Sequence, residues 1–179
     1  MTAMTDQKLA RDIYQAAHLT GEFTLRSGVT ATEYFDKYLF ESDPRLLKRI
    51  ADALAPQVPT DGVDALAGLE TGGIPLAVVL AQVTGIPAYF IRKEAKSYGT
   101  CRLAEGGDID GKRLFIVEDV ITSGGAVLDA LHELRNRGAR IDSGVCVIDR
   151  EAGGLKNLSD NGVDIRALFT MSQLKEAGE

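Results

Sequence analysis

Apolar residues recur with helical spacing in the first part of the chain and form short strand-like runs in the rest. Between Leu9 and Ala17, for example, they share one face of a helix. Pro44 suits the first turn of a later helix, because its fixed backbone angle fits that position. The elements expected here are a helix over 5–19, a short strand and turn over 23–28, an extended aromatic-rich segment over 34–40 and a helix over 43–54.

From Val63 onward, strand-like and helix-like segments alternate, which is typical of βαβ units. The expected order is a strand to Leu69, a helix over 75–83, strands over 86–91 and 112–118, a helix over 124–137, and strands over 140–149 and 163–169. This order predicts an α/β fold with a mostly parallel central sheet flanked by helices and joined by right-handed crossovers. There is no internal repeat.

The segment from Glu94 to Asp110 breaks this alternation, since it is polar, contains glycine and shows little apolar periodicity. Loops of this length are uncommon and usually bind a ligand or cover a site. We therefore expect a long, mobile lid loop between two strands.

The run from Leu114 to Ala126 carries the strongest functional signal. An apolar strand leads into Glu118 and Asp119, and a turn of small residues then opens a helix. Backbone N–H groups at such a turn suit a phosphate, and the two carboxylates can accept hydrogen bonds from ribose hydroxyls. The pattern favours a sugar phosphate as ligand. The alternative is an ordinary strand-to-helix turn in which Thr122 only caps the helix.

Composition limits the classes of function. The 179 residues suit one domain with a sizeable core, and 45% hydrophobic with 26% charged residues is typical of globular proteins. The net charge of −6 disfavours nucleic acid as the main partner. No stretch approaches the roughly 18 consecutive apolar residues of a membrane span. With only two cysteines, Cys101 and Cys146, we expect a cytoplasmic protein without disulfides.

The run from Leu114 to Ala126 resembles the signature with which type I phosphoribosyltransferases bind 5-phosphoribosyl 1-diphosphate. The start of the lid, Arg92-Lys93-Glu94-Ala95-Lys96-Ser97-Tyr98-Gly99, narrows the resemblance to the orotate phosphoribosyltransferase family. Further matches occur at 23–28, 68–77 and 148–150, so the resemblance extends over most of the chain.

The resemblance implies a role for each matched segment. The diphosphate would be held by lid cations and by backbone groups of a second glycine-rich turn: Arg92, Lys93, Lys96, Tyr98, Thr71 and Gly72. Ribose hydroxyls would be held by Glu118 and Asp119, with Lys96 and Asp119 as the catalytic pair. The 5′-phosphate would be held by Val120, Ile121, Thr122, Ser123, Gly124, Gly125 and Ala126.

Orotate would be held by Arg26, Tyr34, Phe35, Thr122 and Arg150, the last because a guanidinium fork suits a planar carboxylate. The residues themselves leave two alternatives to orotate binding. The paired aromatics can be core residues, and Arg150 can pair with a neighbouring acid on the surface.

The chain departs from the family at three positions. Tyr98 stands where many members have histidine, and it carries no positive charge at neutral pH. Gly72 stands where the family often has lysine, and Arg26 replaces a lysine near the base site.

The resemblance implies transfer of a 5-phosphoribosyl group to orotate, with Mg²⁺ bound mainly through the diphosphate and ribose and with no dedicated protein ligands. It also implies a homodimer with shared active sites. We expect one phosphoribosyltransferase domain over 1–179, with an N-terminal hood over 1–40 and the lid over 92–110. Two alternatives are transfer to another nucleobase and a non-catalytic sensor of 5-phosphoribosyl 1-diphosphate.

Overall fold

The computed structural model describes residues 3–24, 28–94 and 103–179. Its centre is a six-stranded sheet with strand order β5-β4-β3-β6-β7-β8, in which only the β4–β5 pairing is antiparallel. The strands are β3 (Ala65–Leu69), β4 (Ala88–Ile91), β5 (Ala104–Glu105), β6 (Leu114–Ile121), β7 (Ser143–Asp149) and β8 (Asp164–Thr170). The expected α/β fold with a mostly parallel sheet is confirmed.

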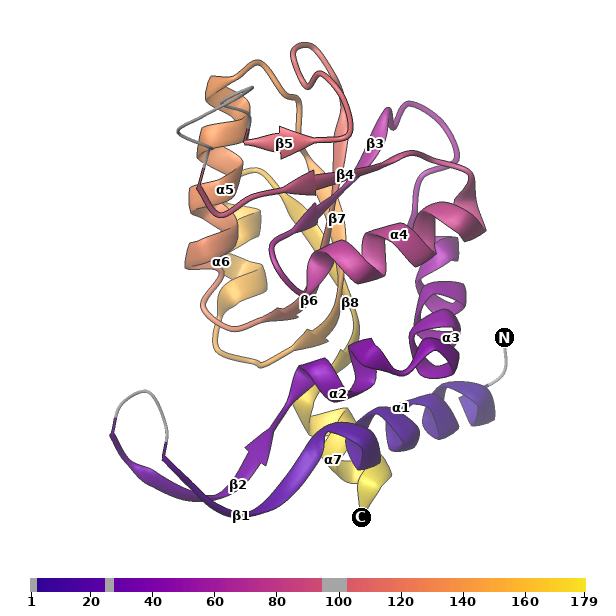
Figure 1. Cartoon of the computed structure of the whole chain (residues 1–179), viewed down its shortest axis with the longest axis vertical. Helices are drawn as coiled ribbons and strands as arrows, with labels where there is room; N and C mark the ends of the chain where they lie inside the picture. Colours follow the sequence, from indigo (N-terminus) through magenta and orange to yellow (C-terminus); the bar gives the residue numbers. More distant parts are fainter. Residues whose placement is uncertain (1–2, 25–27, 95–102) are drawn as a thin grey trace.

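Helices cover both faces of this sheet (Figure 1). On one face, α3 (Pro44–Leu54) and α4 (Gly73–Thr84) pack against the inward side chains Leu66, Phe115 and Val117. On the other, α5 (Gly125–Asn136) and α6 (Gly154–Asp160) pack against the alternate strand residues. Because successive strand residues point to opposite faces, each apolar strand feeds both cores.

A smaller part of the molecule lies beyond one end of the sheet (Figure 1). It consists of α1 (Ala3–Ala17), the antiparallel hairpin of β1 (His18–Thr24) and β2 (Thr30–Phe35), the short helix α2 (Lys37–Ser42) and the last helix, α7 (Met171–Gly178). Apolar residues of α1 and α7 join the same core as α3 and α4, so both ends of the chain are packed together.

Most expected elements are present with small shifts at their ends, but several differ. The strand expected over 23–28 instead runs from His18 to Thr24, as β1. The extended segment expected over 34–40 is wrong: β2 ends at Phe35, and Asp36 caps α2 by accepting a hydrogen bond from the Tyr38 N–H at 3.1 Å. Helices α6 and α7 were not expected at all. The helix over 43–54 is confirmed, with Asp43 as its N-cap and Pro44 in its first turn.

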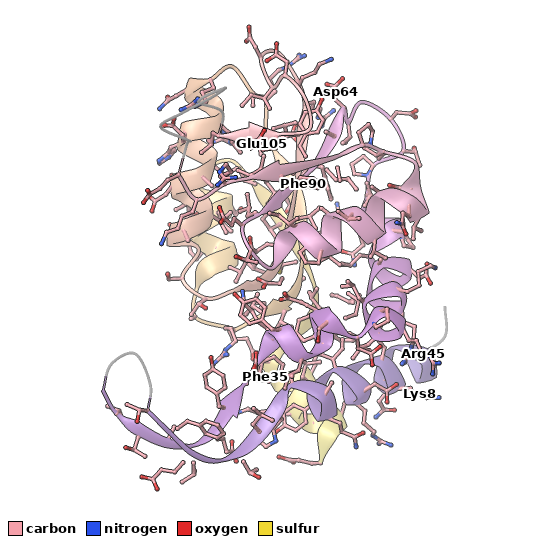
Figure 2. The ribbon with its side chains drawn as sticks, viewed as in Figure 1. Lys8, Phe35, Arg45, Asp64, Phe90 and Glu105 are labelled. Carbon is pink, nitrogen blue, oxygen red and sulfur yellow. The ribbon has the colours of Figure 1, made fainter. Side chains whose placement is uncertain are left out.

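Two further expectations concern loops and membranes. Part of the segment expected to be a long lid forms β5, whose Glu105 pairs with Phe90 of β4 at the edge of the sheet (Figure 2).

In the described ranges, no helix is both long and apolar enough to cross a membrane.

Candidate active site

A pocket of about 510 Å³ opens where β3, β4 and β6 end, at the carboxyl edge of the sheet. Open α/β sheets bind their ligands at this edge, because the loops that follow parallel strands gather there. Its lining brings together predicted residues from two distant segments of the sequence: Arg92, Lys93, Glu118, Val120, Ile121, Thr122, Ser123, Gly124, Gly125 and Ala126.

The turn between β6 and α5 forms one wall of this pocket. Gly124 is the N-cap of α5, has a φ of 78°, and provides no side-chain cap. The first N–H groups of a helix have no partner within the helix, so here they are available to an anion. Thr122 is not the helix cap, and the interpretation of this segment as an ordinary capped turn is wrong.

The chain beyond β7 supports this turn from behind. The Arg150 N–H donates to the Ile121 carbonyl at 2.9 Å, and the Asn157 side chain donates to the Ser123 carbonyl at 3.1 Å. Gly154 lies so close that a Cβ there would be 2.3 Å from the Thr122 carbonyl oxygen. The carbonyls of the turn are thus engaged on the side away from the pocket, which leaves its N–H groups to face a ligand.

The two acids of β6 point in opposite directions. The strand was expected to end at Glu118, but it continues to Ile121, so both acids follow the alternation of an extended strand. Glu118 lies on the α5 side and lines the pocket, whereas Asp119 lies on the other side and is fully buried. A Cβ at Gly72 would be only 1.7 Å from Asp119 Oδ2, so Asp119 fills the space beside that glycine.

Helix α2 brings a lysine and a third acid to Asp119. Lys37 Nζ forms an ion pair with Asp119 Oδ2, and the Lys37 side chain also lines the pocket. Glu41, one turn later on α2, is 7% exposed, and its carboxyl lies beside that of Asp119 next to Gly72. The cluster thus joins the N-terminal part of the chain to the central sheet.

The carboxyl groups of this cluster do not share one protonation state. Burial raises the pKa of Glu41 to about 9 and raises that of Glu118 well above its usual value, and in both cases the nearby Asp119 anion adds to the effect. For Asp119, burial acts in the same direction, but the neighbouring Glu118 and Glu41 carboxyls and the Lys37 ammonium outweigh it and lower the pKa. The three acids therefore shift in different directions, and Asp119 is the one that is favoured as the anion.

Two of the four predicted lid residues are among the described residues. Arg92 and Lys93 follow β4 and line the pocket. Glu70, at the end of β3, accepts a hydrogen bond from the Lys93 N–H at 2.8 Å and fixes the backbone of this segment. Lys96 and Tyr98 lie outside the described residues.

The second glycine-rich turn, between β3 and α4, lies next to the pocket but differs from the first. Glu70 lines the pocket, whereas Thr71 and Gly72 do not. The Glu70–Thr71 peptide bond is cis. Gly72 has no room for a side chain, because Asp119 and Glu41 fill that space.

The predicted orotate residues are not gathered in this pocket, apart from Thr122. Tyr34 is 44% exposed and lies against Phe23, with ring centroids 5.5 Å apart, whereas Phe35 packs on the core beside Phe40 (Figure 2). Phe35 thus fits the core interpretation of the aromatic pair. Arg26 lies outside the described residues.

Arg150 is exposed just after β7 and does not line the pocket. The neighbouring acids have other partners. Asp149 accepts a hydrogen bond from the Glu151 N–H, and Glu151 accepts two from Ser172. These contacts argue against a surface pairing of Arg150 with either acid.

Sequence reasoning missed several polar residues that the structure places in or behind the pocket: Lys37, Glu41, Glu70, Asp129 and Glu133. Lys37 and Glu41 are four residues apart, a spacing that puts both on one face of a helix. Asp36 was the available sign of that helix, since aspartate is a favoured N-cap.

Within the described part of the chain, no group of three or more histidine, cysteine or acidic side chains is arranged to hold a metal ion. Mg²⁺ in phosphate sites is commonly bound through substrate oxygens and water with few protein ligands. The donor set is thus compatible with a magnesium ion that arrives with its substrate.

Comparison with known proteins gives a consistent result. Residues 40–165 match the family described as "Phosphoribosyl transferase domain". An orotate phosphoribosyltransferase of Nocardioides sp. is 53% identical over 174 residues, 97% of each chain, and one of Methanocella arvoryzae is 46% identical over 86% of this chain and 87% of its own.

Solved structures give the same picture. An orotate phosphoribosyltransferase of Mycobacterium tuberculosis superposes with a TM-score of 0.85 at 27% identity, covering 95% of this chain and 98% of its own. That of Aeropyrum pernix gives a TM-score of 0.80 at 29% identity, covering 94% and 96%.

Proposed function

The chain belongs to the phosphoribosyltransferase family and, within it, to the orotate phosphoribosyltransferases, and from this premise we propose the reaction and the roles of its residues. The enzyme transfers the 5-phosphoribosyl group of 5-phosphoribosyl 1-diphosphate to orotate, giving orotidine 5′-phosphate and diphosphate for pyrimidine biosynthesis. The observation that carries this proposal is that one pocket unites the small-residue turn after β6 with Glu118 and with the two cations that follow β4, Arg92 and Lys93.

The substrate spans these three features in order. The segment from Val120 to Ala126 holds the 5′-phosphate through the N–H groups at its α5 end, because the start of that helix offers unpaired donors and a favourable dipole. The Val120 N–H is not one of these donors, since it donates to Asp119. Glu118 faces the ribose hydroxyls, and Asp119 completes the acid pair behind it. Arg92 and Lys93 hold the diphosphate together with Lys96, Tyr98 and backbone groups of Thr71 and Gly72.

In the reaction, the bond between C1 of ribose and a diphosphate oxygen breaks, and a ring nitrogen of orotate forms the new bond to C1 and loses its proton to the departing diphosphate or to water. The transition state has oxocarbenium character, and negative charge moves to the departing diphosphate. Cations beside the diphosphate stabilise that charge, and a bound Mg²⁺ would supply further positive charge there. No covalent intermediate with the protein is needed.

The base site is completed by Arg150, Thr122, Arg26 and the aromatic pair of β2. Arg150 follows β7, which is the second strand from β3 in the sheet. Its N–H donates a hydrogen bond to the Ile121 carbonyl at the end of β6, so it lies at the same sheet edge as the turn after β6. A guanidinium fork there suits the orotate carboxylate.

The chain functions as one phosphoribosyltransferase domain, with residues 1–40 as hood and 92–110 as lid. It acts as a homodimer whose partner completes the diphosphate site with lid residues. We place it in the cytoplasm, where Cys146, buried and with a pKa raised by that burial, stays a reduced core residue.

The test is diphosphate release by the purified enzyme with 5-phosphoribosyl 1-diphosphate, Mg²⁺ and one base at a time: orotate, uracil, adenine or hypoxanthine. We expect turnover with orotate alone. Turnover with another base and none with orotate would overturn the choice of acceptor. Tight binding of 5-phosphoribosyl 1-diphosphate without turnover of any base would indicate a sensor instead.

Dimerisation has a separate test. At an orotate concentration well below KM, a chain carrying Arg150→Ala and a chain carrying Lys96→Ala are each expected to lose most of their activity. Mixing them should restore part of the activity, because a shared site then combines one intact lid with one intact base site. No recovery after subunit exchange would contradict shared sites.

A further inference from the structure

One ion pair connects the N-terminal part of the chain to the acid pair of the pocket. Lys37, the first residue of α2, reaches Asp119 on β6. The Asp119 side chain is 0% exposed, whereas that of Lys37 is 32% exposed and lines the pocket. The ion pair thus lies at the boundary between the ligand space and the core.

The groups around Asp119 come from three elements. Its Oδ1 accepts a hydrogen bond from the Val120 N–H, and Glu41 approaches the same carboxylate from α2. Glu118 precedes it on the same strand. The β3–α4 turn contributes only Gly72, which has no side chain.

Lys37 is the one cation among the groups that contact Asp119 in the described residues. A buried carboxylate without a cation tends to take up a proton, because burial disfavours its charged form. Neither Glu41 nor Glu118 can replace the lysine, since both are acids whose pKa values are already raised next to the Asp119 anion.

We propose that Lys37 is a positioning residue for phosphoribosyl transfer, one that keeps Asp119 an anion and thereby fixes the acid pair against the ribose. The proposal rests on the proposed function, since it assigns Glu118 and Asp119 to the ribose hydroxyls. It adds a residue from outside the signature run, and it makes α2 part of the machinery of the site.

The proposal predicts an activity loss that depends on pH. Without the cation, the pKa of Asp119 should rise by about one to three units, which is typical for the loss of a close opposite charge. The kcat/KM of Lys37→Met, divided by that of the wild type, should therefore fall between about pH 8.5 and about pH 5.5, by up to about tenfold. Ionisation of the substrates cancels in this ratio.

The experiment measures kcat and KM for 5-phosphoribosyl 1-diphosphate across that pH range, with orotate saturating. Lys37→Arg should follow the wild type, because it restores a cation. Lys48→Met is the matched control, since Lys48 forms an exposed ion pair with Asp52 on α3, and its ratio should stay constant. If Lys37→Met does not fold, as judged by its circular dichroism melt, Lys37→Gln takes its place.

Two results would overturn the proposal. A ratio that stays flat with pH would show that Lys37 has only a structural role, and a Lys37→Arg enzyme as impaired as Lys37→Met would show that charge is not what matters. If the wild type shows no turnover with orotate, the proposed function fails first and the positioning role fails with it. An active wild type with a flat ratio fails the positioning role alone.

Discussion

Two glycine-rich turns follow neighbouring parallel strands of the sheet, and the space around their glycines differs. The turn after β3 contains Gly72 and Gly73, and added Cβ atoms there would lie 1.7 Å from Asp119 Oδ2 and 2.3 Å from the Val117 carbonyl oxygen. At Gly125, after β6, the nearest atom would be Ser123 Oγ at 3.8 Å. Glycine is needed for packing at both positions of the first turn, whereas in the second turn Gly125 leaves space for a ligand and Gly124 serves the backbone, with a φ of 78°.

This difference explains one departure from the family pattern. A lysine is often found where this chain has Gly72, but Asp119 and Glu41 occupy the space that its side chain would need. Lys37 supplies a cation to the same neighbourhood from α2. The two glycine-rich turns therefore resemble each other in sequence but differ in the role of their glycines.

The largest effect is expected where the first turn is most crowded. Gly72→Ala should destabilise the protein by about 3 kcal/mol or more and abolish turnover, because the new methyl group displaces a buried ion pair. Urea unfolding followed by circular dichroism measures the first effect and diphosphate release the second. Wild-type stability in this variant would show that the turn is not packed as described.

The second expected effect concerns the base site beside the β6 turn. Arg150→Ala should raise KM for orotate by about tenfold to a hundredfold, as for loss of a charge-assisted hydrogen bond, with little change in stability. Arg166→Ala is the matched control, because Arg166 is an exposed arginine of β8, with 65% of its side chain accessible. Equal KM values in both variants would remove Arg150 from the base site.

The third expected effect tests whether Gly125, in the turn after β6, is open as described. Gly125→Ala should change the free energy of unfolding by no more than about 1 kcal/mol, because the position is open and helical. It should raise KM for 5-phosphoribosyl 1-diphosphate by about tenfold, since a methyl group would stand between the N–H groups and the phosphate. A stable variant with unchanged KM would place the phosphate elsewhere.

The fourth expected effect concerns pH and stability and leaves turnover out of account. The pKa of Glu41 is raised to about 9 in the folded protein, so between its ordinary value and about 9 the folded state binds one more proton than the unfolded state. The free energy of unfolding should therefore fall as pH rises through that window, by at most about 1.4 kcal/mol per unit for one proton. Glu41→Gln should flatten this slope in urea unfolding between about pH 6 and about pH 9. An unchanged slope would mean that Glu41 is already ionised.

The sequence predicted the sheet and the turn between β6 and α5 because both depend on local patterns. Apolar runs set the strands, and the small residues after Asp119 mark the start of α5. The capping box at Thr170 and Gln173 also marked α7, but that signal was not used.

The cluster at Asp119 could not be predicted in the same way. It depends on α2, for which the aromatic residues near Tyr34 wrongly predicted extended structure. It also depends on a contact between residues far apart in the sequence. The opposite orientations of Glu118 and Asp119 depend on β6 continuing to Ile121, which the apolar pattern did not reveal.

The most direct test of the account is a titration of the isotope-labelled protein with ribose 5-phosphate, followed by the chemical shifts of backbone amides. This probe carries the 5′-phosphate and the ribose hydroxyls but no diphosphate. The largest shifts are predicted at Ser123 to Ala126, with smaller ones at Gly72 and Gly73. Saturable binding that leaves the amides of Ser123 to Ala126 unshifted would contradict the assignment of the phosphate to the turn after β6.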